Sequence, residues 1–114
     1  MKIRTWTNGV IYIIDIQGDM NIADSNRLKE LVMRMIEKKG EGFIINTEKI
    51  KSIDLNGIGA FINISSTLKK LDMSLAIAGV SEALEQVIDK TKLARYFPIY
   101  KNVDEALQKL SSNL

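Results

Sequence analysis

Apolar residues along this chain fall into short continuous runs that alternate with helically spaced stripes. Val10 to Ile16 is a run rich in β-branched residues, and Phe43-Ile44-Ile45 and Leu75 to Gly79 are two further runs. Such runs are typical of strands that are covered on both faces of a sheet. Met1 to Thr7 precedes the first run across Asn8-Gly9, a dipeptide typical of tight hairpins. The pattern therefore predicts an opening hairpin followed by buried strands.

Four helices are predicted between and after these runs, each with an apolar stripe. Asn21 is expected to cap the first helix, and the second is expected from about Gly57 to Leu71. Ser81 is expected to cap the third helix and Asn102 the last. Strands and helices in this order predict an α/β fold with a mixed, mostly parallel sheet, an N-terminal hairpin and about four helices. Val103, Leu107 and Leu110 of the last helix are expected to face inward, and Leu114 is a further candidate.

Length and composition narrow the choice of function. A chain of 114 residues is expected to form a single domain, 1–114. Lys and Arg number 16 against 14 Asp and Glu, and this balance argues against a nucleic-acid partner. The chain has no cysteine and no histidine, which removes thiol catalysis and the commonest general base and metal ligand. We therefore expect a binding protein rather than an enzyme, with no cofactor, no metal and no catalytic residue.

The apolar runs are also too short for a membrane span, so no membrane insertion is expected. The residues at the start of the chain lack the long apolar core of a signal peptide. A cytoplasmic location is the expectation that follows.

The most informative stretch is Ser52 to Ala60, where a strand gives way to the second helix. The first amides of a helix have no partners within the helix, so anions and protein partners are often bound there. Asn56 stands immediately before Gly57, and Gly59 follows one residue later. Each glycine costs a helix roughly 1 kcal/mol relative to alanine. Close packing against the backbone is the expected compensation, with partner access as a functional addition.

Three stretches in order resemble the STAS domain, the fold of bacterial anti-sigma-factor antagonists. They are Ile16 to Met20, then Ile44 to Asn46 with Ile53 to Gly59, and finally Leu93 to Tyr100 before a capped last helix. The resemblance implies a protein that binds an anti-sigma factor, often a serine kinase, and so frees a sigma factor. In the family the kinase phosphorylates a serine or threonine immediately before the first glycine, which weakens the complex.

Asn56 occupies this phosphorylation-equivalent position, and Leu55 occupies the other position that is usually small or hydroxyl-bearing. An amide cannot accept a phosphoryl group, and it resembles the unphosphorylated state because it adds no charge. The hypothesis is that the usual reaction does not switch this protein off and that it stays competent to bind. A purely structural role for Asn56, as the cap of the second helix, is compatible with this. Whether another hydroxyl, such as that of Ser52, accepts the phosphoryl group stays open.

A partner surface is expected where the predicted strands end, because loops at the carboxyl ends of parallel strands collect binding residues. Affinity is expected to come from apolar contacts around Leu55 and Ile58. The alternative for Asp19 and Asn21 is a tight turn plus a cap, and for Asp54 a local hydrogen bond that shapes the turn. The expected partner-binding residues are Asp19, Asn21, Asp54, Leu55, Asn56, Gly57 and Ile58.

The expected partner is an anti-sigma factor or another serine-kinase-like protein. The chain is expected to be a monomer or a weak dimer, because Met1 to Thr7 is either a free edge strand or a dimer contact. Other STAS relatives serve as subunits of lipid-transport complexes, as scaffolds of stress signalling or as domains of anion transporters. These roles, and a small-molecule binding module, are the alternatives that the sequence leaves open.

Overall fold

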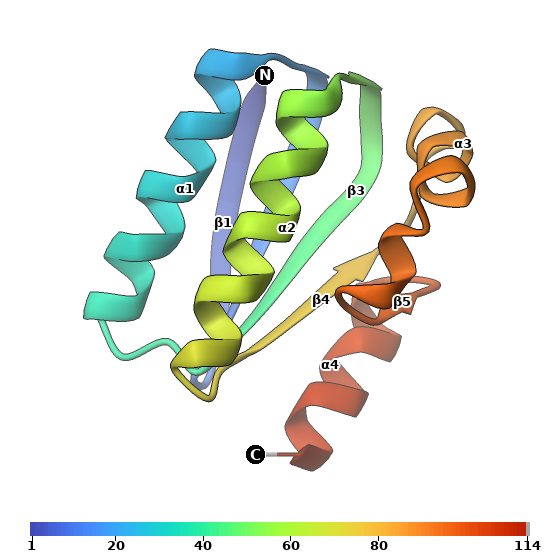
Figure 1. Cartoon of the computed structure of the whole chain (residues 1–114). Helices are drawn as coiled ribbons and strands as arrows, with labels where there is room; N and C mark the ends of the chain where they lie inside the picture. The colour runs from blue at the N-terminus through green and yellow to red at the C-terminus, as the bar shows by residue number, and fades with distance from the viewer. Residues whose placement is uncertain (114) are drawn as a thin grey trace.

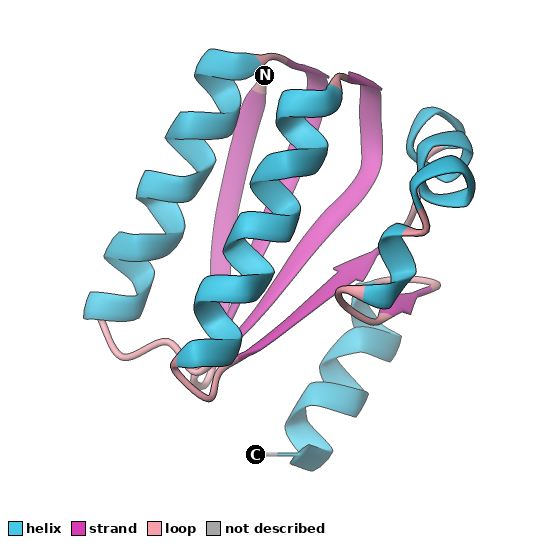
Figure 2. Ribbon diagram, in the orientation of Figure 1, coloured by secondary structure: helices cyan, strands magenta, loops and turns pink. Residues whose placement is uncertain are grey.

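The computed structural model describes residues 1–113, with the side chain of residue 113 excepted. Within that range it holds a five-stranded sheet in the order β1-β2-β3-β4-β5, flanked by four α-helices (Figure 1, Figure 2). β1 is antiparallel to β2, and the other neighbouring pairs are parallel. The predicted α/β fold is therefore confirmed. The elements are β1 (Lys2–Asn8), β2 (Ile11–Met20), α1 (Ile22–Glu37), β3 (Gly42–Ile53), α2 (Leu55–Lys70), β4 (Ser74–Ala78), α3 (Glu82–Thr91), a 3₁₀ turn (Leu93–Arg95), β5 (Ile99–Tyr100) and α4 (Val103–Asn113).

The opening hairpin is confirmed, but its turn is shifted by one residue from the prediction. Asn8 pairs with Ile11, so the two loop residues are Gly9 and Val10 rather than Asn8 and Gly9. Gly9 has a φ of 62°. A two-residue hairpin loop with glycine at its first position is a favoured geometry, because glycine adopts positive φ without strain. The glycine therefore sets the register, and Asn8 becomes the last residue of β1.

Helices cover both faces of the sheet, as the apolar strands require. α1, α2 and α3 lie on one face and α4 lies on the other (Figure 1). Successive residues of β2 point to opposite faces: Ile14 packs in the larger core, and Ile13 packs in the smaller core beneath α4. Ala106 and Leu110 of α4 close that smaller core. The prediction of strands buried on both faces is confirmed.

β3 is much longer than the predicted strand Phe43-Ile44-Ile45. It continues through a bulge, where the register against β2 shifts between Asp15 and Gln17. Beyond the bulge Ile50 is buried while Lys49 and Lys51 are exposed. This segment alternates between buried and exposed residues and lies outside the apolar run. The apolar run alone therefore predicted too short a strand. The extension carries the chain to the far end of the sheet, where α2 begins.

The last helix begins as predicted. Asn102 Oδ1 accepts a hydrogen bond of 2.9 Å from the Glu105 N–H, which caps α4. Val103, Leu107 and Leu110 pack against the smaller core, as expected. Leu114, predicted to face inward with them, lies outside the described residues.

Candidate functional site

The ends of β2 and β3 bring two helix starts together. The strands are parallel, and their last pairs are Asp19 with Ser52 and Met20 with Ile53. α1 begins two residues after Met20 and α2 two residues after Ile53, so both helices start at the same end of the sheet (Figure 1). We call residues 19–22 and 52–56 the tip. The Asp19 loop and the start of α2 therefore lie side by side, where the predicted strands end.

Asp54, not Asn56, caps α2. The Asp54 Oδ1 accepts a hydrogen bond of 2.9 Å from the Gly57 N–H, and its backbone is extended. The helix therefore begins at Leu55, two residues earlier than predicted, and Asn56 is its second residue. The cap role predicted for Asn56 is wrong, because the carboxylate of Asp54 already accepts from the third helical N–H. The local hydrogen bond predicted for Asp54 is confirmed.

Asp54→Ala is expected to lower the free energy of unfolding by about 1 kcal/mol, because the first turn of α2 loses its cap. Asp54→Asn is the matched control: it keeps an acceptor oxygen at the same position and should retain most of the stability. Urea unfolding of the two variants and the wild type measures the difference. Equal stability of the alanine and asparagine variants would show that the cap does not stabilise α2.

The other end of the tip is held by a capping box. Asn21 Oδ1 accepts from the Asp24 N–H at 3.0 Å, and the Asn21 N–H donates to Asp24 Oδ2 at 3.1 Å. The Ser52 hydroxyl donates to Asp19 Oδ1 at 2.5 Å, which joins β3 to β2. Asp19, Asn21 and Ser52 nevertheless stay exposed. These groups are therefore fixed in place and still accessible from solvent.

Two neighbouring apolar residues of α2 have opposite surroundings. The side chain of Leu55 is 80% exposed, whereas Ile58 is only 5% exposed and belongs to the larger core. The expectation that Ile58 contacts a partner directly is corrected, since its side chain already packs against the sheet. Asn56 lies on the exposed side with Leu55. The accessible apolar group at the start of α2 is thus Leu55.

The two glycines of α2 also differ. Gly57 is buried, and a Cβ added to it would lie 2.5 Å from Ile53 Cγ1. Close packing of the backbone, as predicted, is confirmed at Gly57. Gly59 is exposed, and an added Cβ would meet nothing within 4 Å. The same prediction is wrong for Gly59, because that side of the helix faces open space.

A match to a protein family decides what this fold is. Residues 2–106 match the STAS domain. The chain belongs to the STAS-domain family. This confirms the resemblance found in the sequence.

Several relatives of this STAS domain are named anti-sigma-factor antagonists. The anti-sigma-B factor antagonist of Staphylococcus aureus (strain NCTC 8325 / PS 47) is 25% identical over 93 residues, which cover 82% of this chain and 86% of that protein. The crystal structure of an anti-sigma factor antagonist from Mycobacterium paratuberculosis has a TM-score of 0.86 at 14% identity and covers 96% of this chain and 93% of that one. SpoIIAA in its unphosphorylated form has a TM-score of 0.84 at 13% identity, with 97% of both chains covered. The structural matches confirm the fold.

The STAS tip carries one exposed apolar residue that the sequence reasoning missed. Ile22 is the first residue of α1 and is 59% exposed, just as Leu55 is the first residue of α2. Each residue directly follows the capping residue of its helix, Asn21 or Asp54. The strands that lead into these caps are paired, with Met20 of β2 opposite Ile53 of β3. A signal was present, because Ile22 directly follows the predicted cap and lies off the apolar stripe of α1. Two aliphatic side chains therefore project from neighbouring helix starts.

The groups exposed on this STAS tip suit binding. They are two carboxylates, two amides, a hydroxyl and two aliphatic side chains. Within residues 1–113 no three His, Cys, Asp or Glu side chains gather as ligands for a metal ion. None of the helices described there is long and apolar enough to cross a membrane. An apolar contact surrounded by fixed hydrogen-bonding groups is the usual chemistry of a protein interface.

Proposed function

We propose that this STAS domain is an anti-sigma-factor antagonist that binds a kinase-like regulatory protein through its tip, and that phosphorylation at position 56 does not switch it off. It acts by binding rather than catalysis. The observation that carries the proposal is Asn56, which is exposed at the second residue of α2 beside the exposed Leu55. The names of the relatives support the antagonist role.

The side chain of Asn56 keeps the charge of the tip constant. A phosphoserine at this place would add about −1.5 to −2 charges at neutral pH. The carboxamide adds none and has no hydroxyl to accept the phosphoryl group. A partner that binds the tip in its present charge state therefore meets the same surface whether or not a kinase is active.

Within this proposal the tip residues have different roles. Leu55 supplies apolar area, because most of its side chain is free in the isolated chain. Asp19 and Asn56 supply polar groups that fix the orientation of the partner. Ile58 acts beneath them: it anchors the first turn of α2 to the sheet and does not touch the partner.

Asn56→Asp is expected to weaken the complex about tenfold or more, because a carboxylate at the contact must lose its hydration and also lies near Asp54 and Asp19. A negative charge near a helix start does not harm the helix, so the fold should be intact. Calorimetric titration against the purified kinase-like anti-sigma factors of the same genome measures the affinity. Unchanged affinity for a partner that binds the wild type would contradict this surface.

Asn56→Ser is the matched test of the missing switch. It restores a hydroxyl where relatives accept the phosphoryl group. With labelled ATP and the partner kinase, this variant should take up phosphate and dissociate, while the wild type should stay bound. Label on Ser52 of the wild type, with loss of binding, would contradict constitutive binding. Label on neither protein would show that position 56 is not a kinase site in this fold.

A further inference from the structure

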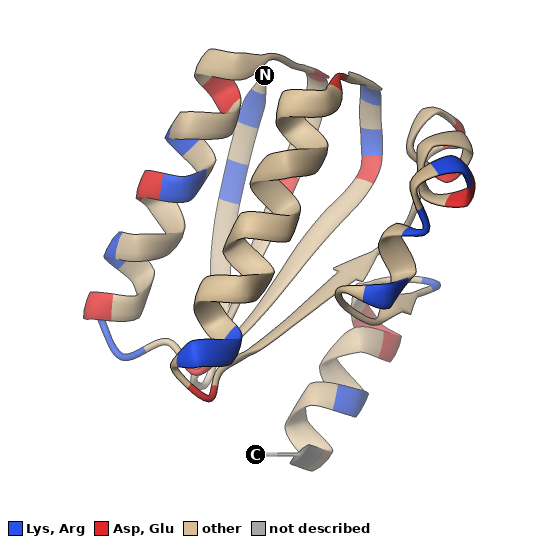
Figure 3. Cartoon of the chain, in the orientation of Figure 1, with Lys and Arg blue, Asp and Glu red and all other residues tan. Residues whose placement is uncertain are grey.

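The outer face of α2 is free of charge over most of its length. No Asp, Glu, Lys or Arg occurs in α2 before Lys69 and Lys70 in its last turn (Figure 3). The exposed residues before that turn are Leu55, Asn56, Gly59, Asn63 and Ser66. In contrast, α1, α3 and α4 carry charged side chains along their lengths (Figure 3). Because 26% of the residues in this chain are charged, an uncharged exposed face on a 16-residue helix is unusual.

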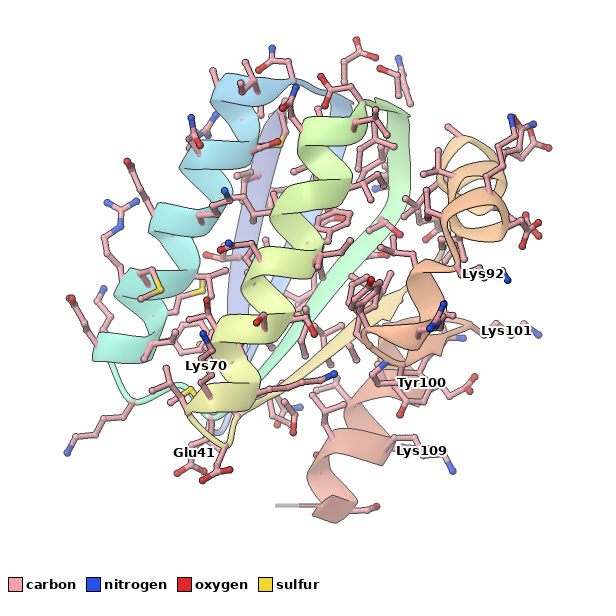
Figure 4. The ribbon with its side chains drawn as sticks, in the orientation of Figure 1. Glu41, Lys70, Lys92, Tyr100, Lys101 and Lys109 are labelled. Carbon is pink, nitrogen blue, oxygen red and sulfur yellow. The ribbon has the colours of Figure 1, made fainter. Side chains whose placement is uncertain are left out.

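An apolar hollow continues this face toward α1. It measures about 310 Å³ and lies between the two helices, whose side chains are drawn in Figure 4. Met33 is 47% exposed beside it, whereas Val32 and Met35 on the apolar stripe of α1 are buried. The hollow is lined by Lys29, Val32, Met33, Asn63, Ile64 and Thr67.

Gly59 provides a second, independent observation. It costs the helix roughly 1 kcal/mol relative to alanine. At Gly57 the neighbouring Ile53 accounts for that cost, but nothing lies within 4 Å of a Cβ added to Gly59. No contact inside the chain therefore requires glycine there. Glycine at this place leaves the helix backbone open to close approach by another molecule.

The size of the tip points the same way. A stable protein interface uses roughly 20–30 residues on each side. The tip, residues 19–22 and 52–56, is much smaller than that. Two of the 16 residues of α2 already belong to the tip. At 1.5 Å per residue, the rest of the helix extends the available contact by roughly 21 Å.

The geometry points to a docking surface that runs along the uncharged part of the outer face of α2, from Leu55 to the hollow beside Met33, and stops before the lysines of the last turn. This rests on the proposed function, since the occupant is the same regulatory partner that meets the tip. The part of the partner that meets α2 is uncharged, because the centre of an interface is depleted of charges and α2 offers no counter-charge before Lys69. Within residues 1–113, Lys29 of α1 is the one charged residue that lines the hollow. Gly59 is the point of closest approach.

Asn63→Lys is expected to weaken the complex at least tenfold, because it places a cation in the middle of the uncharged face. Gln108→Lys on α4 is the matched control: it also turns an exposed helical amide into lysine, but on the opposite face of the sheet. Lysine favours helix more than asparagine does, so both variants should fold. Titration against the purified anti-sigma factor that binds the wild type measures the affinities, and sedimentation of each protein alone reports self-association.

The outcomes separate this inference from the proposed function. Weak binding by Asn63→Lys with normal binding by Gln108→Lys supports the surface. Normal binding by Asn63→Lys while Asn56→Asp binds poorly limits the contact to the tip: it overturns the inference and leaves the proposed function standing. Normal binding by both of these α2 variants overturns both. An equal loss in both lysine variants is a general charge effect and overturns the inference, as does a wild-type dimer that Asn63→Lys dissociates, because the occupant would then be a second copy.

Discussion

Leu55→Ala is expected to weaken partner binding by about 30-fold, since losing an anchoring side chain at the centre of an interface costs about 2 kcal/mol. Its free energy of unfolding should hardly change. The Leu55 side chain is 80% exposed, so it contributes little to the core. Alanine is also a good helix former at the first position of α2. The variant therefore separates binding from folding, and titration paired with urea unfolding measures both quantities.

Leu71→Ala is the control for this prediction. Leu71 follows α2 at its opposite end and is 47% exposed, so the same substitution removes exposed apolar area far from the tip. It should leave affinity within about twofold of the wild type. Comparable losses from Leu55→Ala and Leu71→Ala would mean that the partner has no preference for the tip. No loss from Leu55→Ala would remove the apolar anchor from the proposal.

The order of strands and helices was predictable because burial on two faces leaves a strong pattern. The run from Val10 to Ile16 contains alternating members of both cores, so nearly every position is apolar. The end of β3 was not predictable in the same way. There Ile50 is buried and Ile53 partly buried, while Lys49 and Lys51 are exposed. Pairing with β2 keeps this segment extended, and such pairing between distant segments leaves no signal in a local apolar count.

The site was predictable in its position but not in its details. Asp54 and Asn56 are both of residue types that cap helices well. The cap is the one whose backbone is extended and whose side chain accepts from the N–H three residues later, and the sequence alone does not show which of the two that is. The burial of Ile58 had a readable signal, since it lies on one stripe with Phe61, Ile64 and Leu68. The exposure of Ile22 had a readable signal too, but its place beside Leu55 depends on the pairing of β2 with β3. That is a property of the packed structure.

The proposed function, antagonist activity without a switch at position 56, has a consequence for regulation. If the tip keeps one charge state, the amount of free antagonist is set by its synthesis and by competing partners rather than by the kinase. The fixed hydrogen bonds of the tip, from Ser52 to Asp19 and from Gly57 to Asp54, suit such a permanently formed surface. A preformed surface loses less conformational entropy when a partner binds.

Gly57→Ala and Gly59→Ala are expected to change stability in opposite directions. At Gly57 the new Cβ would lie 2.5 Å from Ile53 Cγ1 and force the packing apart, which should lower the free energy of unfolding by about 1–3 kcal/mol. At Gly59 the Cβ enters open space, and the gain in helix propensity should raise it by about 0.5–1 kcal/mol. Urea unfolding of both variants measures the two shifts.

These two variants, which differ only in position along one helix, also test why Gly59 is a glycine. A loss of stability in Gly59→Ala would reveal an internal constraint at this residue and remove one support of the α2 docking surface. A gain in stability shows that the chain itself would fold better with alanine. If the stabilised variant also binds the partner less tightly, the added methyl group occupies space that the partner needs. The opposite signs of the two effects would then place the reason for Gly59 in the complex and not in the fold.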